Sequence, residues 1–403
     1  MLNRRGFLLS GSKALLLLGS AALAAPRSAR QQGGDSNEIT LFVCGDVMTG
    51  RGVDQVLPHP SEPRIYERGM SSARGYVELA ERAHGPIPRP VDFSYIWGDA
   101  LEVWERMAPD VKIINLETAV TRSDDWMAKG INYRMHPGNV PCLTAAGIDC
   151  CVLGNNHILD WGEGGLVETL ATLQKAGLKT AGAGGDLEEA RVPAIMDLPG
   201  QGRVLVFSFG WASSGIPHEW AASRHRPGVN YLGEISDDTV RTIAERIESV
   251  KRSRDIVVAS IHWGGNWGYD VPPRQKQFAH RLIDEASVDV VHGHSCHHPK
   301  GVEVYKSRPI LYGCGDFLND YEGISGYEKY RDDLALMYFV TMDVVEGKLN
   351  RLKMTPLRIM RFRLNLASPE EARWLRDTLS REGAKLGTQV EVQADNSLTL
   401  EWD

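Results

Sequence analysis

Apolar segments that end in polar residues able to bind metal constrain the fold of this chain more than any other feature. Segments such as ITLFVCGDV, VKIINLE and DIVVASIHWG are rich in β-branched residues and indicate buried strands. Between such segments lie amphipathic stretches, for example GEGGLVETLATLQKAG and SDDTVRTIAERIESVKRS. This alternation predicts an α/β fold, and a hairpin-like pattern near its end predicts that the sheet is mixed.

The polar residues at the ends of these segments form a series. They are Asp46, Glu117, the pair Asn156 and His157, His262, and His294. In α/β sheets, ligands bind beyond the carboxyl ends of the strands, so the series predicts one shared site. Taken alone, the stretch CVLGNNHILDWG at residues 151–162 is equally a polar turn, but the repetition favours an active site.

Carboxylates, an amide oxygen and several imidazoles form a mixed oxygen and nitrogen ligand set. This set suits Mn, Fe or Zn better than Ca or Mg, which prefer oxygen ligands alone. The number of candidate ligands exceeds the number that one four-coordinate zinc with an open position can use. It predicts a pair of divalent ions about 3.5–4 Å apart, as in two-metal hydrolysis. A histidine beside the pair that binds no metal can protonate the leaving group.

Residues 1–25 resemble a twin-arginine export signal. Arg4 and Arg5 precede a short apolar run, and Ala22-Leu23-Ala24 supplies a small-residue cleavage pattern. The run is shorter than the ~20 residues of a membrane span, although an uncleaved anchor is the alternative. We therefore expect an exported protein, periplasmic or extracytoplasmic, with a flexible leader over residues 26–38.

The net charge bears on the class of binding partner, and the placement of the cysteines bears on whether they form disulfides. The formal net charge of -7 argues against nucleic acid as a partner. Among the six cysteines, four lie in apolar runs and are expected to be free thiols. These four are Cys44, Cys150, Cys151 and Cys314. The sequence leaves the state of Cys142 and Cys296 open.

Seven motifs follow one another between residue 39 and about residue 320: GDVMTGR, NLETAVT, NYRMHP, GNNHILDWG, HWGGNWGY, GHSCHHPKGVEVY and ILYGCGDFLND. Their order resembles that of the CapA family, which is named for poly-γ-glutamate capsule synthesis. The resemblance implies a calcineurin-like metallophosphoesterase fold, which is a four-layer α/β/β/α sandwich with mixed sheets. We place this domain at residues 39–365, followed by a C-terminal helix and short β extension at residues 366–403.

The resemblance also implies roles for individual residues. The implied metal ligands are Asp46, Glu117, Asn156, His262, His294 and His297. His157 matches the general acid of the fold, and Asp160 is expected to orient its imidazole. Arg51 and Arg134 are predicted to contact an anionic substrate, because an arginine fork suits carboxylate or phosphate.

This chain departs from the pattern of the wider superfamily at three positions. Met48 stands where the opening Asp-x-His motif has its histidine, which leaves one metal site short of a ligand. Asn266 stands where many relatives have glutamate. His297 and His298 are rival candidates for the last ligand, and the spacing favours His297.

These observations predict an exported CapA-like protein of capsule or envelope polymer metabolism. The favoured activity is metal-dependent hydrolysis, in which a metal-activated hydroxide attacks a phosphoester or an amide of an anionic polymer. The expected partners are that anionic polymer or a phosphorylated substrate, and a membrane-bound polymer synthase. The alternative is a non-catalytic factor that binds the growing polymer, and the methionine at position 48 favours this alternative.

Overall fold

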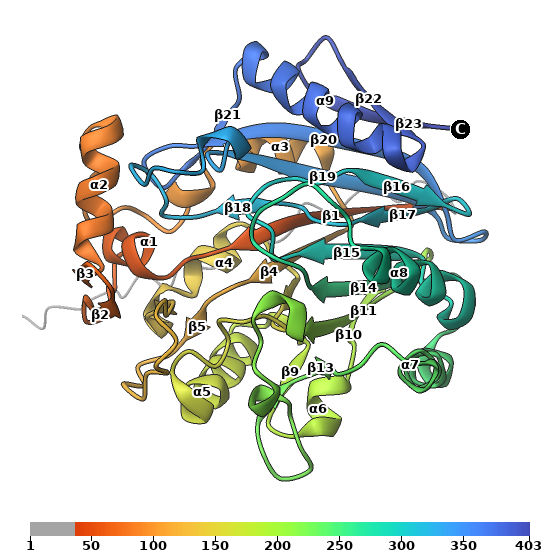
Figure 1. Cartoon of the computed structure of the whole chain (residues 1–403), viewed down its shortest axis with the longest axis horizontal. Coiled ribbons are helices and arrows are strands. Elements are labelled where there is room, and N and C mark those ends of the chain that lie inside the picture. The colour runs from red at the N-terminus through yellow and green to blue at the C-terminus, as the bar shows by residue number, and fades with distance from the viewer. Residues whose placement is uncertain (1–36) are drawn as a thin grey trace, which may run out of the picture. The chain divides into compact units, whose positions relative to one another are not determined.

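Two stacked β-sheets form the centre of the structure, a computed structural model that describes residues 37–403 (Figure 1). The predicted signal peptide and nearly all of the predicted leader lie outside the described residues.

The larger sheet has ten strands and is mixed. Its order is β22-β23-β20-β19-β1-β4-β7-β8, with β18 paired to β1 and β21 paired to β20. Four strands of this sheet run parallel to β1, namely β4, β7, β8 and β18. Strand β19 runs antiparallel to it. The strands are β1 (Glu38–Val47), β4 (Val111–Leu116), β7 (Cys150–Val152), β8 (Lys179–Ala181), β18 (Asp316–Leu318), β19 (Leu334–Asp343), β20 (Lys348–Ile359), β21 (Leu364–Leu366), β22 (Thr388–Val392) and β23 (Leu398–Trp402).

The smaller sheet has seven strands in the order β10-β11-β14-β15-β17-β16, with β13 paired to β11. Its central strands are parallel, and β10 and β16 are antiparallel strands at its two edges. The strands are β10 (Ala194–Leu198), β11 (Gly202–Trp211), β13 (Tyr231–Leu232), β14 (Asp255–His262), β15 (Val290–His294), β16 (Val302–Tyr305) and β17 (Arg308–Leu311).

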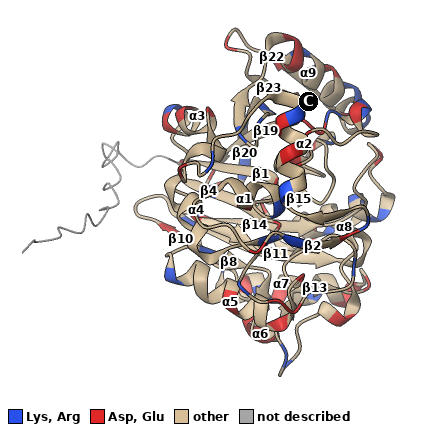
Figure 2. Ribbon diagram, turned by 90° about the vertical axis from the view of Figure 1, so that its left-hand side faces the viewer, with Lys and Arg blue, Asp and Glu red and all other residues tan. Residues whose placement is uncertain are grey.

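Helices cover the outer face of each sheet. The helices are α1 (Arg51–Val56), α2 (Arg74–His84), α3 (Ala100–Met107), α4 (Pro141–Ala145), α5 (Gly162–Lys175), α6 (Leu187–Arg191), α7 (Asp237–Val250), α8 (Pro273–Ala286) and α9 (Pro369–Gly383). The described residues also form three two-stranded sheets. They pair β2 (Arg64–Glu67) with β3 (Met70–Ser72), β5 (Ala119–Val120) with β6 (Arg134–Met135), and β9 (Ala183–Gly184) with β12 (Gly228–Val229). Figure 2 shows that the surface helices contain both Lys or Arg positions and Asp or Glu positions.

Alternate residues of the strands divide the apolar core into three layers. In β1, Phe42 packs with residues of α1, α3, α4 and α5, whereas Leu41 and Val43 pack between the sheets. In β14, Val257 packs with residues of α7 and α8, whereas Val258 faces the core between the sheets. Because successive side chains of a strand point to opposite faces, this arrangement confirms the α/β/β/α sandwich with mixed sheets.

The C-terminal segment forms the expected helix and two strands. Ser368 caps α9 through a capping box with Glu371. Strands β22 and β23 form a hairpin, and β23 pairs with β20 of the larger sheet. Within residues 37–403, no helix combines the length and the apolar character that a membrane span requires.

Strand register brings the predicted ligands to one place. Asp46 of β1 pairs with Asn115 of β4, and His262 of β14 pairs with His294 of β15. A hydrogen bond joins the two sheets near these strand ends, because His292 of β15 donates to the carbonyl oxygen of Cys44 in β1. The carboxyl ends of the parallel strands therefore meet at a shared edge.

Candidate metal centre

Asp46 is the common member of two buried groups of potential ligands. One group is Asp46, His262 and His294, and the other is Asp46, His297 and Asp316. Within each group, one ligand atom from each residue lies within 4.8 Å of the others. The carboxylate of Asp46 is thus common to both groups, each of which could hold a metal ion.

Three carboxyl groups are buried together here, because Asp46, Glu117 and Asp316 are at most 2% exposed. Burial, and then the charge of Asp316, raise the pKa of Asp46 to about 7. Burial, and then the charge of Asp46, raise the pKa of Glu117 well above its ordinary value. Such a concentration of buried carboxyl groups requires protons or cations as compensation.

A chain of hydrogen bonds sets the tautomer of His294. His292 must donate from Nε2, which lies 2.7 Å from the Cys44 carbonyl oxygen. Burial lowers the pKa of His292 to about 4, so its Nδ1 accepts from Ser260 Oγ at 3.0 Å. Ser260 Oγ then accepts from His294 Nε2 at 2.9 Å. His294, whose pKa burial also lowers, is left with an unprotonated Nδ1 that faces Asp46.

His262 presents a second bare nitrogen to the same place. Its Nε2 lies 3.1 Å from the amide oxygen of Asn156, which accepts, and burial lowers its pKa well below the ordinary value. Its Nδ1 is therefore unprotonated and lies 2.8 Å from His294 Nδ1. Two lone pairs at this distance repel unless a cation lies against both.

Glu117 adds a further unsatisfied acceptor. Among residues 37–403, its Oε2 has no hydrogen-bond partner although the side chain is buried. Its Oε1 lies 3.7 Å from Nε2 of both His157 and His262. This acceptor, the facing imidazole nitrogens and the clustered carboxyl groups fit divalent transition metal ions, for which the ligand set is also suited.

His157 lies beside the centre and is held by Asp160. Its Nδ1 is 2.6 Å from Asp160 Oδ2, so Nδ1 donates and Nε2 points toward Glu117. Burial lowers the pKa of His157 to about 4, and Asp160 opposes this shift. Asp160 is itself fixed by the backbone N–H of Tyr133 at 2.6 Å. The geometry is that expected of an imidazole oriented by a carboxylate.

His297 and His298 have different surroundings. His297 Nδ1 lies 2.8 Å from Asp316 Oδ1, and its Nε2 lies 3.1 Å from the side-chain amide of Asn266. His298 Nε2 instead accepts from the Gly268 N–H, and its ring stacks on Tyr330. The structure therefore brings His297, and not His298, to the carboxylates.

The two predicted substrate arginines are both engaged in internal contacts. Arg51 is 4% exposed, and its guanidinium binds Asp320 and Glu67 and lies over the rings of Tyr76 and Tyr133. These contacts occupy its donors and give no support for the predicted substrate contact.

Arg134 is likewise buried. Its guanidinium donates to the carbonyl of Ser123 and to Asp124 and lies over the ring of Trp161. Its surroundings, like those of Arg51, are those of a side chain that holds loops together.

Sequence reasoning missed several residues of the centre. Asp316 follows the apolar segment RPILYGCG and repeats the strand-end pattern, so a signal for it was present. Ser260 and His292 lie two residues before strand-end histidines and carried no signal of their own. Lys129 lies in a loop, yet its Nζ is 2.7 Å from Asp160 Oδ1 and 3.3 Å from His157 Nδ1.

All six cysteines are buried and free, including Cys142 and Cys296, which the sequence left open. Burial raises the pKa of the Cys142 and Cys150 thiols above their ordinary range. These thiols are therefore packing residues rather than nucleophiles.

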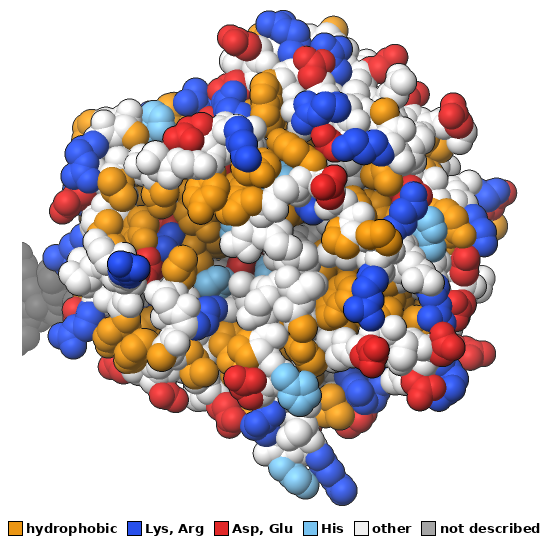
Figure 3. Space-filling model, viewed as in Figure 1, with side chains coloured by type: hydrophobic (Ala, Val, Ile, Leu, Met, Phe, Trp, Pro, Cys, Tyr) orange, Lys and Arg blue, Asp and Glu red, His pale blue; other side chains and the backbone are white. Residues whose placement is uncertain are grey.

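Aromatic side chains line the approach to His297. The ring of Trp267 lies 5.4 Å from His297 and stacks on Tyr327 at 4.0 Å with an interplanar angle of 9°. The loop that carries Trp267 is tied to the centre, because the Asn266 carbonyl accepts from the His297 N–H. Figure 3 shows a hollow with histidine and acidic side chains visible inside it and hydrophobic side chains around it.

Comparison with known proteins identifies the family. The model of the family described as bacterial capsule synthesis protein PGA_cap matches residues 40–321. The chain belongs to this family. The resemblance to CapA proteins that the motifs indicate is thereby confirmed, and so is the assignment to a capsule-synthesis family.

Curated relatives support the same assignment. A probable polyglutamine synthesis accessory protein of Mycobacterium tuberculosis is 48% identical over 369 residues, which cover 91% of this chain and 97% of that protein. The PGA biosynthesis protein CapA of Bacillus subtilis is 27% identical over 80% of this chain and 72% of its own length.

Among solved structures, a phosphatase of Mycoplasma pneumoniae has 11% identity and a TM-score of 0.44, over 83% of this chain and 96% of that one.

Proposed function

We propose that this member of the family is a divalent-metal-dependent hydrolase that cleaves a phosphoester or an amide bond of an anionic capsule or envelope polymer. One observation carries the proposal. The buried carboxylate of Asp46 is shared between the His262–His294 pair and the His297–Asp316 pair, and His157 lies alongside with its own orienting carboxylate. Two cation sites with a neighbouring proton donor are the components of two-metal hydrolysis.

The residues of the centre divide into ligands and orienting groups. Asp46, Asp316 and Glu117 supply negative charge, and the bare nitrogens of His262 and His294 supply the softer ligands that favour Mn, Fe or Zn. When bound, two such ions supply Lewis acidity, which lowers the pKa of water and stabilises the entering and leaving oxygens. Ser260 holds His294 in the ligating tautomer.

His157 has the position of an acid–base group beside the leaving group, and it donates a proton from Nε2 when the ring is in its imidazolium form. Its Nε2 points into the centre while Asp160 holds Nδ1. Lys129 binds Asp160 and the carbonyl oxygen of Asn156, so it fixes the loop that carries both residues. The Lys129 side chain is 27% exposed, so its charge is also accessible to an anionic substrate.

The aromatic walls support a polymeric substrate. Trp267 and Tyr327 form a stacked pair beside His297, and Tyr327 is 40% exposed. Flat rings of this kind bury a large contact area against an extended chain at low entropic cost. The relatives are named for polyglutamine synthesis and for PGA biosynthesis. A polymer of the poly-γ-glutamate kind is therefore the proposed substrate class, made by a membrane-bound synthase that acts with this protein.

A non-catalytic, polymer-binding role is the second candidate function, and Met48 favours it. The thioether of Met48 accepts from the Tyr321 hydroxyl at 3.7 Å, at the position where the Asp-x-His pattern has a ligand. Asp316 offsets this loss by supplying a carboxylate to the same group.

The hydrolase proposal is tested with purified protein and a panel of phosphomonoesters, phosphodiesters and poly-γ-glutamate. His157→Ala is expected to lower the rate on the hydrolysed substrate by about 10²–10⁴-fold, because general acid catalysis contributes by this amount. Its metal content is expected to equal that of the wild type. The matched control is His225→Ala, which removes an exposed histidine. Hydrolysis of no panel member, with saturable binding of the polymer, establishes the binding role instead.

The proposal includes export, which rests on the sequence before residue 37. Replacing Arg4 and Arg5 with lysine is expected to keep the precursor in the cytoplasm, because the twin-arginine route reads this pair. Normal export of that variant would show that another route is used.

A further inference from the structure

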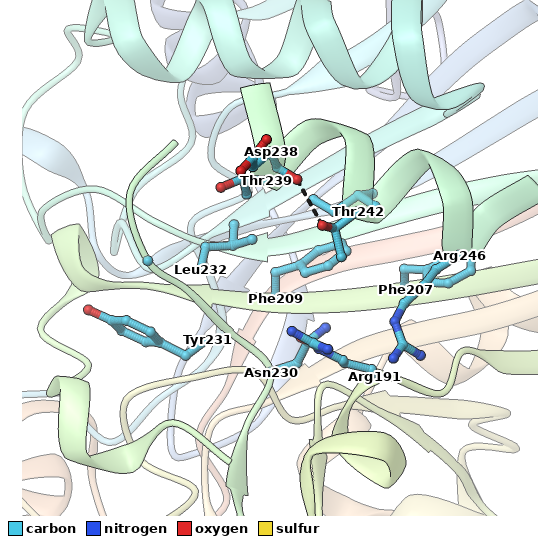
Figure 4. A pocket seen from close by; sticks show the side chains of 12 residues that line it. Arg191, Phe207, Phe209, Asn230, Tyr231, Leu232, Asp238, Thr239, Thr242 and Arg246 are labelled. Atoms are coloured by element: carbon cyan, nitrogen blue, oxygen red, sulfur yellow. Dashed lines mark hydrogen bonds between the residues drawn. The ribbon is translucent and has the colours of Figure 1, made fainter. Parts of the chain in front are cut away.

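A second pocket lies on the outer face of the smaller sheet, between α6, α7 and the end of β11. Its volume is about 270 Å³, and none of its lining residues belongs to the candidate metal centre. Figure 4 shows Arg191 and Arg246 next to each other at one end, and Asp238 and Thr239 at the opposite end.

The wall of this pocket that the sheet supplies is apolar and flat. Phe207 and Phe209 are alternate residues of β11 that face outward beneath α7, and Ile243 of α7 packs with them. Tyr231 lines another side. Tyr231 is half-buried and offers its ring to the body of a ligand, whereas Phe207 and Phe209, at 3% and 4% exposed, add only small apolar areas.

The two arginines give one end of the pocket a positive charge. Among residues 37–403, no carboxylate is paired with the guanidinium of Arg191, which lies at the C-terminal end of α6. Burial and then the charge of Arg246 lower the pKa of Arg191, and the charge of Glu188 offsets this only in part, so a further anion near the two guanidinium groups relieves an unfavourable contact. Arg246 pairs with Glu188, but that carboxylate is 73% exposed, and ion pairs of this kind contribute little.

Asn230 adds a buried polar group. Its side chain is 7% exposed, and its Nδ2 donates to the Ser208 carbonyl at 2.9 Å. Among the described residues, no donor is bonded to the Oδ1 of Asn230, which lines the same pocket. This oxygen can only accept a hydrogen bond, so the carboxylate of a ligand is expected to lie away from it, at the end of the pocket with the two arginines.

We propose that this pocket binds a small aryl carboxylate, with the carboxylate against Arg191 and Arg246 and the ring against Tyr231. The charge balance favours a monoanion, because Glu188 already offsets part of the positive charge of Arg246 and Asp238 lies at the far end. A planar guanidinium binds a carboxylate in a bidentate manner, which fixes the orientation of the ring.

The test is calorimetric titration of the full chain with phenylacetate as the probe. The wild type is expected to bind phenylacetate saturably, and Arg191→Met is expected to bind at least about tenfold more weakly. Arg191→Lys, which keeps the charge but loses the fork, is expected to fall between them. Arg82→Met is the matched control, because Arg82 is an exposed arginine of α2 that does not line the pocket.

Two further ligands separate the contribution of the aromatic ring from that of the negative charge. Phenylethanol has the ring without the charge, and inorganic phosphate has the charge without the ring. Both are expected to bind at least about tenfold more weakly than phenylacetate. The proposal is overturned by equal binding of either ligand, by equal binding of phenylacetate to Arg191→Met, or by no saturable binding up to about 10 mM.

Discussion

Asp46 and Asp316 are direct partners in the parallel pairing of β1 with β18. Paired residues of neighbouring strands point to the same face, so the two carboxyl groups lie side by side in the buried centre. Asp316 is therefore a potential ligand beside Asp46, in a centre where Met48 replaces the histidine of the Asp-x-His pattern. The two carboxyl groups keep potential metal ligands there in spite of that substitution.

Ser260→Ala is expected to weaken metal binding. The serine hydroxyl links His292 to His294 and leaves Nδ1 of His294 bare for ligation. Loss of such an orienting group typically costs about 10–100-fold in metal affinity. The affinity is measured by competition with a chelator of known strength.

Ser208→Ala is the matched control for this experiment. Ser208 is the register partner of Ser260 on β11, and among residues 37–403 its buried hydroxyl has no hydrogen-bond partner. If both variants bind metal as the wild type does, the hydrogen-bonded chain does not set the tautomer of His294.

Lys129→Met is expected to lower kcat while metal content is unchanged. The variant removes the cation that binds Asp160 and the carbonyl of Asn156, so the loop that presents His157 loses its restraint. Metal analysis and steady-state kinetics on the same sample provide the measurement, with the exposed Lys348→Met as the control. A loss of metal equal to the loss of rate would place Lys129 among the groups that hold the ions.

Arg51→Met is expected to destabilise the fold by about 3–5 kcal/mol, because removing one partner of a buried ion pair leaves the other uncompensated. The partners left behind are Asp320 and Glu67, whose side chains are at most 6% exposed. Urea denaturation of the variant and the wild type gives the difference in free energy of unfolding. If the variant has normal stability but a raised KM, the result would support the substrate contact that the sequence predicts for Arg51.

The sequence predicts those features that depend on local pattern. Asp46, His262 and His294 each end an apolar run, and the sheet edge follows from parallel strands, so their meeting is predictable. The four layers follow in the same way from strands that alternate with amphipathic helices.

The sequence does not predict features that depend on distant pairings. Asp316 lies in a strand of three residues, and only its pairing with β1 shows that it faces Asp46. Arg51 meets Asp320 across 269 positions of the chain, so no local pattern could show that its charge is already paired. Lys129 lies outside the helices and strands, where no periodicity fixes the direction of a side chain.

The metal content of the purified protein and of two variants tests the central claim most directly. The wild type, purified without chelator, is expected to hold about two Mn, Fe or Zn ions per chain by elemental analysis. Asp316 belongs to one ligand group and Asp46 to both, so Asp316→Asn is expected to keep about one ion and Asp46→Asn close to none. A wild-type protein that holds none of these metals and takes none up, or an Asp46→Asn variant with the wild-type content, would contradict the account.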